Sequence, residues 1–186
     1  MDDPSDLYRW YVELQRTHAD RAIIAAIERR TAESDGDARR TLSFILASEF
    51  CRQEQYAEAE SILIEISEQD PGEPYPLVAL AEQKLYYEDD PAVALAIIEQ
   101  AVRRARASGD FCRNALGVKA RIAEKLGRYD LIEDVLREIM SIPFPGSRVD
   151  VGIERDFIDR LPAGTIDATL RARYDAFCCG VSKTSS

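Results

Sequence analysis

The sequence predicts an all-α fold of antiparallel helical hairpins, with extra helices at both ends, and three observations predict it. Apolar residues recur at i, i+3, i+4 and i+7, the spacing of the buried face of an amphipathic helix. Equivalent positions return after 35 residues, from Ala59 to Ala94, and after 38, from Ala94 to Ile132. The 9 glycines and 8 prolines are sparse among the 186 residues and mostly separate these periodic stretches, where helices are expected to end.

Residues 1–39 are predicted to form an N-terminal helical cap. Two apolar stripes between residues 4 and 31 favour two helices with a break near His18, and one continuous helix is the alternative. The segment "AESDGDA", residues 32–38, is predicted to be a loop. The first stripe consists of Leu7, Trp10, Tyr11 and Leu14, and the second of Ala22, Ile23, Ala26 and Ile27.

Residues 40–142 are predicted to form three hairpins, because six further stripes follow one another in this range. Gly127 marks a turn, and Asp90-Pro91 marks a helix start, since aspartate caps helices and proline suits the first helical position. The first helices carry Leu42, Ile45, Leu46 and Phe50, then Leu77, Leu80, Ala81 and Leu85, then Leu116, Ala120 and Ala123; the second helices carry Ala59, Ile62, Leu63 and Ile66, then Ala94, Ile97, Ile98 and Ala101, then Ile132, Val135, Leu136 and Ile139.

Residues 143–179 are predicted to contain capping helices, because an array of hairpins needs atypical ends to cover its exposed apolar faces. A Pro/Gly-broken linker spans 141–152, and short apolar patterns predict helices around 153–161 and 166–178. The polar tail 180–186 is predicted to be disordered.

The segment "LASEFCRQEQYAEAESILIEISEQDP", residues 46–71, resembles the tetratricopeptide repeat. Residues 74–107 and 113–142 resemble it in part, with Lys84 where an aromatic residue is usual, so the resemblance covers roughly 40–142. It implies a short right-handed superhelix with a concave groove; HEAT-like and other hairpin solenoids are the alternatives. The matching positions in the first repeat are Leu46, Ala47, Phe50, Tyr56, Ala59 and Pro71.

The concave groove implied by this resemblance is lined by the first helix of each hairpin. Such a groove suits an amphipathic helix or an extended peptide with apolar anchors, unless the C-terminal helix folds back and fills it. The paired Lys and Asn with which some family members hold a terminal carboxylate are absent. Transfer by register predicts the peptide-binding residues Phe44, Ser48, Arg52, Tyr75, Val78, Glu82, Leu85, Tyr86, Asn114 and Arg121.

The net charge of the chain indicates which classes of partner it can bind. With 34 acidic and 24 basic residues the net charge is -10, which repels phosphate backbones and anionic lipids, so nucleic acid and membrane are not expected as partners. The acidic N-terminus lacks the pattern of a signal peptide, so a cytoplasmic location is expected. The expected partner is another protein or peptide, and the chain itself is expected to be a monomer or a homodimer.

The sequence contains no motif for catalysis, cofactors or metals. It lacks the glycine-rich phosphate and dinucleotide loops and the nucleophile elbow. Its 4 cysteines have no metal-ligand spacing, and the single histidine, His18, lies far from them. Adjacent Cys178 and Cys179 suggest a redox switch only weakly, because neighbouring residues rarely reach disulfide geometry. We therefore expect no enzyme activity, cofactor, catalytic residue or metal site.

These observations favour a protein-interaction module, an adaptor or scaffold that binds a peptide or helix in its groove. Two alternatives stay open. One is a small acidic chaperone of the secretion type that shields apolar segments of its cargo. The other is a regulatory subunit or an unrecognised enzyme.

Overall fold

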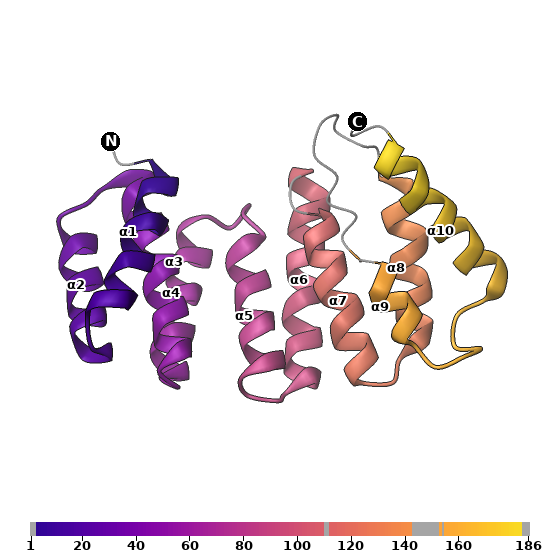
Figure 1. The fold of residues 1–186 in the computed structure, drawn as a ribbon, viewed down its shortest axis with the longest axis horizontal. Coiled ribbons are helices and arrows are strands. Elements are labelled where there is room, and N and C mark those ends of the chain that lie inside the picture. Colours follow the sequence, from indigo (N-terminus) through magenta and orange to yellow (C-terminus); the bar gives the residue numbers. More distant parts are fainter. Residues whose placement is uncertain (1–2, 110–111, 143–152, 154, 184–186) are drawn as a thin grey trace. The chain divides into compact units, whose positions relative to one another are not determined.

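The computed structural model describes residues 3–109, 112–142, 153 and 155–183, with the backbone alone at 155 and 179–183 (Figure 1). These residues form ten helices and no strand, which confirms the predicted all-α class. The helices are α1 (Pro4–Thr17), α2 (Asp20–Ala32), α3 (Gly36–Arg52), α4 (Tyr56–Gln69), α5 (Tyr75–Tyr86), α6 (Pro91–Ser108), α7 (Cys112–Lys125), α8 (Tyr129–Ser141), α9 (Arg155–Arg160) and α10 (Ala168–Lys183).

The chain divides into two compact units, Met1–Pro71 and Gly72–Ser186. The division falls between the first and second predicted hairpins, whereas the sequence suggested boundaries at 39 and 142. Apolar periodicity locates the buried face of a helix, but it does not encode how consecutive hairpins group into units.

In the Met1–Pro71 unit, α3 packs against α1, α2 and α4. The break at His18 is as predicted: its backbone N–H closes the last turn of α1 on the carbonyl of Leu14. The guanidinium carbon of Arg30 lies 4.5 Å from the ring centroid of Trp10, which ties α2 to α1. The predicted N-terminal cap is thus itself a helical hairpin that packs on α3.

The predicted loop at 32–38 is shorter than expected, because α2 continues through Ala32 and α3 begins at Gly36. The carbonyl of Asp35 accepts the N–H of Arg39 at 3.2 Å, which closes the first turn of α3. Gly36 has φ +51, a conformation that glycine adopts without strain. The polar segment that was predicted to be a loop therefore includes the start of α3.

In the Gly72–Ser186 unit, Figure 1 shows α5 to α8 side by side with successive helices antiparallel. Helix α7 packs against α5, α6 and α8, and α10 packs against α8 and α9. The start of α6 follows its predicted signal, because Asp90 caps the helix by accepting the N–H of Val93 at 3.1 Å. Gly109 ends α6 with φ +81. A continuous apolar core includes residues from α5 to α10, among them Ile98, Leu116, Ile122, Ile132, Leu136 and Tyr174.

The C-terminal helices differ from their predicted bounds. Helix α9 covers only 155–160, and α10 begins at Ala168 and extends to Lys183, so 180–183 is helical where a disordered tail was predicted. A glycine such as Gly180 costs a helix only about 1 kcal/mol, which does not by itself stop it. Residues 184–186, and the predicted linker beyond Ile142, lie outside the described residues.

The close contact between α3 and α4 depends on Ala59, which is fully buried. We expect Ala59→Leu to destabilise the protein by about 1 to 3 kcal/mol, because extra methylene groups in a filled core force shifts of side chains and backbone. The matched control is Ala57→Leu on the exposed face of α4, which should change little. Urea unfolding monitored by circular dichroism distinguishes the two variants, and equal stability of both would contradict the packing described here.

Candidate functional site

The ten residues predicted to line a groove fall on three helices in two units. Phe44, Ser48 and Arg52 lie on α3, in the first unit. The others lie on α5 and α7, in the second unit. The structure therefore groups them as two separate sets.

On α3, Arg52 has a structural role that the groove prediction did not anticipate. Its guanidinium forms ion pairs with Glu49 at 2.5 Å and with Asp20 of α2 at 2.6 Å. The exposed hydroxyl of Ser48 donates to the carbonyl of Phe44 at 3.0 Å, within its own helix. The Nε and Nη2 donors of Arg52 are thus engaged inside the unit, so its main role there is structural.

Glu49, which sequence reasoning missed, is fully buried and accepts hydrogen bonds from two helices. Tyr11 of α1 donates to Oε2 at 2.8 Å, and Gln53 donates to Oε1 at 2.6 Å. Burial alone raises the pKa of Glu49, but hydrogen bonds from Arg52, Gln53, Tyr11 and Gln15 outweigh it and lower that pKa to about 2. The carboxylate is therefore charged at neutral pH and holds α1 on α3.

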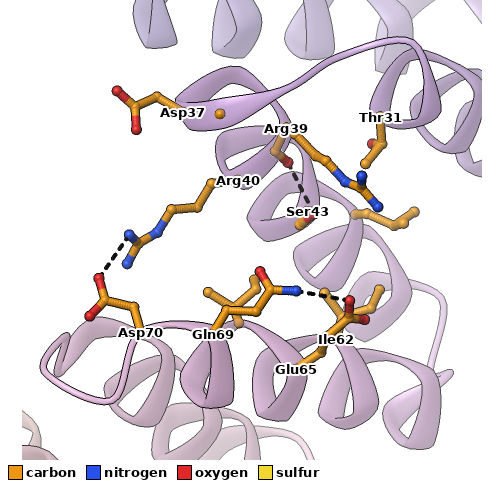
Figure 2. Close-up of a pocket in the computed structure, with 12 residues that line it drawn as sticks. Thr31, Asp37, Arg39, Arg40, Ser43, Ile62, Glu65, Gln69 and Asp70 are labelled. Atoms are coloured by element: carbon orange, nitrogen blue, oxygen red, sulfur yellow. Dashed lines mark hydrogen bonds and ion pairs between the residues drawn. The ribbon is translucent and has the colours of Figure 1, made fainter.

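A cavity of about 540 Å³ in the first unit lies between the N-terminal half of α3 and the C-terminal half of α4 (Figure 2). Its size suits a small ligand. However, several of its polar side chains are already paired: Arg40 with Asp70 at 3.2 Å, Gln69 with Glu65 at 3.0 Å, and Ser43 with the carbonyl of Arg39 at 3.0 Å. These pairings leave the cavity poorly equipped to select a ligand.

On α5, the predicted site residues divide into exposed and buried ones. Tyr75 and Tyr86 are 36% and 56% exposed, so they turn away from the packing stripe. Val78 and Leu85 are 1% and 5% exposed and belong to the core, which corrects their assignment as open groove residues. Because α5 contacts both α6 and α7, it buries a wider stripe of residues than a helix that packs against a single neighbour. The exposed tyrosines remain the candidate anchors.

A second cavity, of about 760 Å³, brings together α5, α7 and α9. Leu85 forms an apolar part of its wall, beside the exposed ring of Tyr86. Lys125 pairs with Asp89 at 2.9 Å. The lining residues are Leu85, Tyr86, Asp89, Arg121, Glu124, Lys125 and Arg160.

Arg121 connects the predicted residues of this second set. Its guanidinium interacts with the hydroxyl of Tyr86 and lies near the carboxylate of Glu82. Burial raises the pKa of Glu82, against the opposing effect of Arg121, and partial burial likewise raises the pKa of Tyr86. On the same helix the side-chain oxygen of Asn114 is buried and accepts no hydrogen bond from any described residue. The structure thus brings Glu82, Tyr86 and Arg121 together.

The remaining chemistry-bearing residues that the structure describes form no second site. No three His, Cys, Asp or Glu side chains among the described residues gather as a metal site would require. His18 is exposed at the end of α1, and burial raises the pKa of the Cys112 thiol, which keeps it protonated and unreactive at neutral pH. Cys179 lies outside the described side chains. No helix in the described part of the chain is long and apolar enough to cross a bilayer.

Comparison with known proteins found no matching family model, no matching curated protein and no matching solved structure.

Proposed function

We propose that this protein is a TPR-like interaction module, an adaptor or scaffold that binds a peptide or helix of another protein on the face formed by α5 and α7. This face consists of the exposed Tyr75 and Tyr86 and the partly buried Glu82, Asn114 and Arg121, and we call it the α5–α7 face.

The packing within each unit supports the TPR-like part of the proposal. Helix α3 contacts α1, α2 and α4, and α7 contacts α5, α6 and α8. In both units, therefore, the first helix of a hairpin rests on both helices of the preceding hairpin and on its own partner. This is the nearest-neighbour packing of stacked helical repeats.

The single observation that carries the binding function is the convergence of Tyr86 and Arg121 beside the 760 Å³ cavity. Tyrosine and arginine are the residue types most enriched at the energetic centres of protein interfaces. A tyrosine that is 56% exposed contributes little to the core, so its removal is expected to affect binding rather than folding.

The test compares Tyr86→Ala with a matched control, Tyr8→Ala, which removes a tyrosine that is 46% exposed on α1. The partner is captured from an extract of the source organism with the wild-type protein and then purified. We expect Tyr86→Ala to weaken its binding by roughly thirtyfold, or about 2 kcal/mol, with an unchanged melting temperature. Tyr8→Ala should bind as the wild type does.

Two results would contradict the proposal. If Tyr86→Ala lowers stability by about 3 kcal/mol, its ring is a core residue and not an anchor. If the stable variant binds the partner with unchanged affinity, the binding surface lies elsewhere on the chain.

A further inference from the structure

We propose that the α5–α7 face selects acidic segments of its partner, with Arg121 and Arg160 receiving a carboxylate side chain beside Tyr86. This inference rests on the proposed function, because it names the class of partner for the same face. It commits to aspartate or glutamate within a peptide.

The cationic side chains that line the cavity support this inference. Three cationic side chains line it, and Lys125 is neutralised by Asp89 at 2.9 Å. Arg121 and Arg160 form no ion pair with any residue that the structure describes; Arg160 only faces the ring of Phe157, 5.9 Å from its centroid. Four other arginines of this unit do form ion pairs: Arg106 with Glu138, Arg128 with Asp130, Arg137 with Glu133 and Arg171 with Asp159.

The chemistry of these groups suits a carboxylate. A guanidinium presents five N–H donors in a planar fork and binds a carboxylate through two parallel hydrogen bonds. The hydroxyl of Tyr86 interacts with Arg121 and leaves most of these donors available. Leu85 and the ring of Tyr86 supply an apolar wall, so an acidic side chain next to an apolar one fits the cavity.

Two acidic groups, Glu82 and Glu124, lie near the arginines, but neither forms an ion pair with them in the described structure. Glu124 lines the cavity and forms no ion pair with a described residue. Glu82 lies near Arg121, and burial raises its pKa, which disfavours its charged form. A partner carboxylate that accepts two parallel hydrogen bonds from one of these guanidinium groups gains contacts that neither acidic group makes in the described structure.

The net charge of -10 opposes the approach of an acidic partner at long range. At physiological ionic strength the screening length is about 8 Å, so charges farther away contribute little at the cavity. The local cations therefore decide which segment binds at the cavity.

The experiment uses synthetic peptides in which glutamate flanks one leucine or tyrosine anchor. Three further sets of peptides carry glutamine, lysine or phosphoserine in place of glutamate. Fluorescence anisotropy measures binding to the full chain. We expect the glutamate peptides to bind, and glutamine to weaken binding roughly tenfold or more. Arg121→Ala and Arg160→Ala should cause a similar loss for glutamate peptides only, and Arg121→Lys an intermediate one. Arg173→Ala, an exposed site on α10, is the matched control.

Each of the following outcomes would contradict one part of the proposal. If glutamine peptides bind as tightly as glutamate peptides, and Tyr86→Ala abolishes both, the face binds peptides but the acidic preference is wrong. If phosphoserine peptides bind and glutamate peptides do not, the arginines select phosphopeptides and the proposal fails. If no peptide binds, or Tyr86→Ala changes nothing, the proposed function falls as well. Circular dichroism verifies that each variant is folded.

Discussion

Replacing Arg52 with alanine is expected to destabilise the Met1–Pro71 unit by about 3 kcal/mol at neutral pH. Arg52 donates to both carboxylate oxygens of Glu49, at 3.0 and 2.5 Å, and Glu49 is fully buried. Removing the partner of a buried charge leaves that charge without compensation; the cost is typically about 3 to 5 kcal/mol when both members are buried, and it is lower when solvent reaches one of them, as it does Arg52, whose side chain is 43% exposed. We expect the low end of that range, because Tyr11, Gln15 and Gln53 still donate to the carboxylate. Urea unfolding and amide hydrogen exchange of α3 measure the loss.

The pH dependence of this loss provides its control. The folded-state pKa of Glu49 is lowered from 4.5 to about 2, so its stabilising contribution is complete above pH 4.5 and disappears as the pH falls through about 2. The penalty of Arg52→Ala should therefore shrink toward pH 2, and Glu49→Gln should reduce the acid sensitivity of the unit. An Arg52→Ala variant as stable as the wild type at neutral pH would show that Glu49 is not a buried charge.

In the second unit, Tyr174→Ala is expected to cost about 3 to 5 kcal/mol, the usual cost of emptying an aromatic core position. The side chain of Tyr174 is fully buried, and its ring centroid lies 5.7 Å from that of Phe177. Its hydroxyl donates to the carbonyl of Ile153 at 2.7 Å, which ties α10 to the segment before α9. Equilibrium unfolding in urea gives the difference in free energy.

Two variants separate the contributions of Tyr174. Tyr174→Phe keeps the ring but leaves the carbonyl of Ile153 without this donor, for which about 1 to 3 kcal/mol is expected. Arg173→Ala, at the neighbouring exposed position, should leave stability nearly unchanged. A Tyr174→Ala variant with wild-type stability would mean that α10 does not pack on the core.

The helices were predictable because each buries one regular apolar stripe. The break at His18 and the cap at Asp90 followed from local chemistry that acts within a few residues. The start of α3 at Gly36 and the extension of α10 to Lys183 did not, because glycine and polar residues reduce helix propensity without abolishing helices. The division at Pro71 depends on how hairpins pack together, which no stripe encodes.

The candidate site was predictable only where it follows helix register. The offsets of Tyr75 and Tyr86 from the packing stripe placed them on the exposed face, and the structure agrees. Arg160 joins the cavity from α9, a short helix with no register relation to the hairpins. Glu49 was missed because a single glutamate within an apolar stretch is normally assigned to solvent, and its donor Tyr11 is 38 residues away. The polar residues Tyr11 and Gln15, one turn apart on α1, were the available signal.

The contact between Arg30 and Trp10 gives the first unit an optical signal of its own. The sequence contains a single tryptophan, and that residue lies on α1 within Met1–Pro71. Because the cation lies 4.5 Å from the centroid of the indole ring, separation of α1 from α2 changes the surroundings of the chromophore. Emission excited at the indole band therefore reports on Met1–Pro71 alone, while dichroism reports on helices of both units. Recording the two together shows whether the units unfold in one step or in sequence.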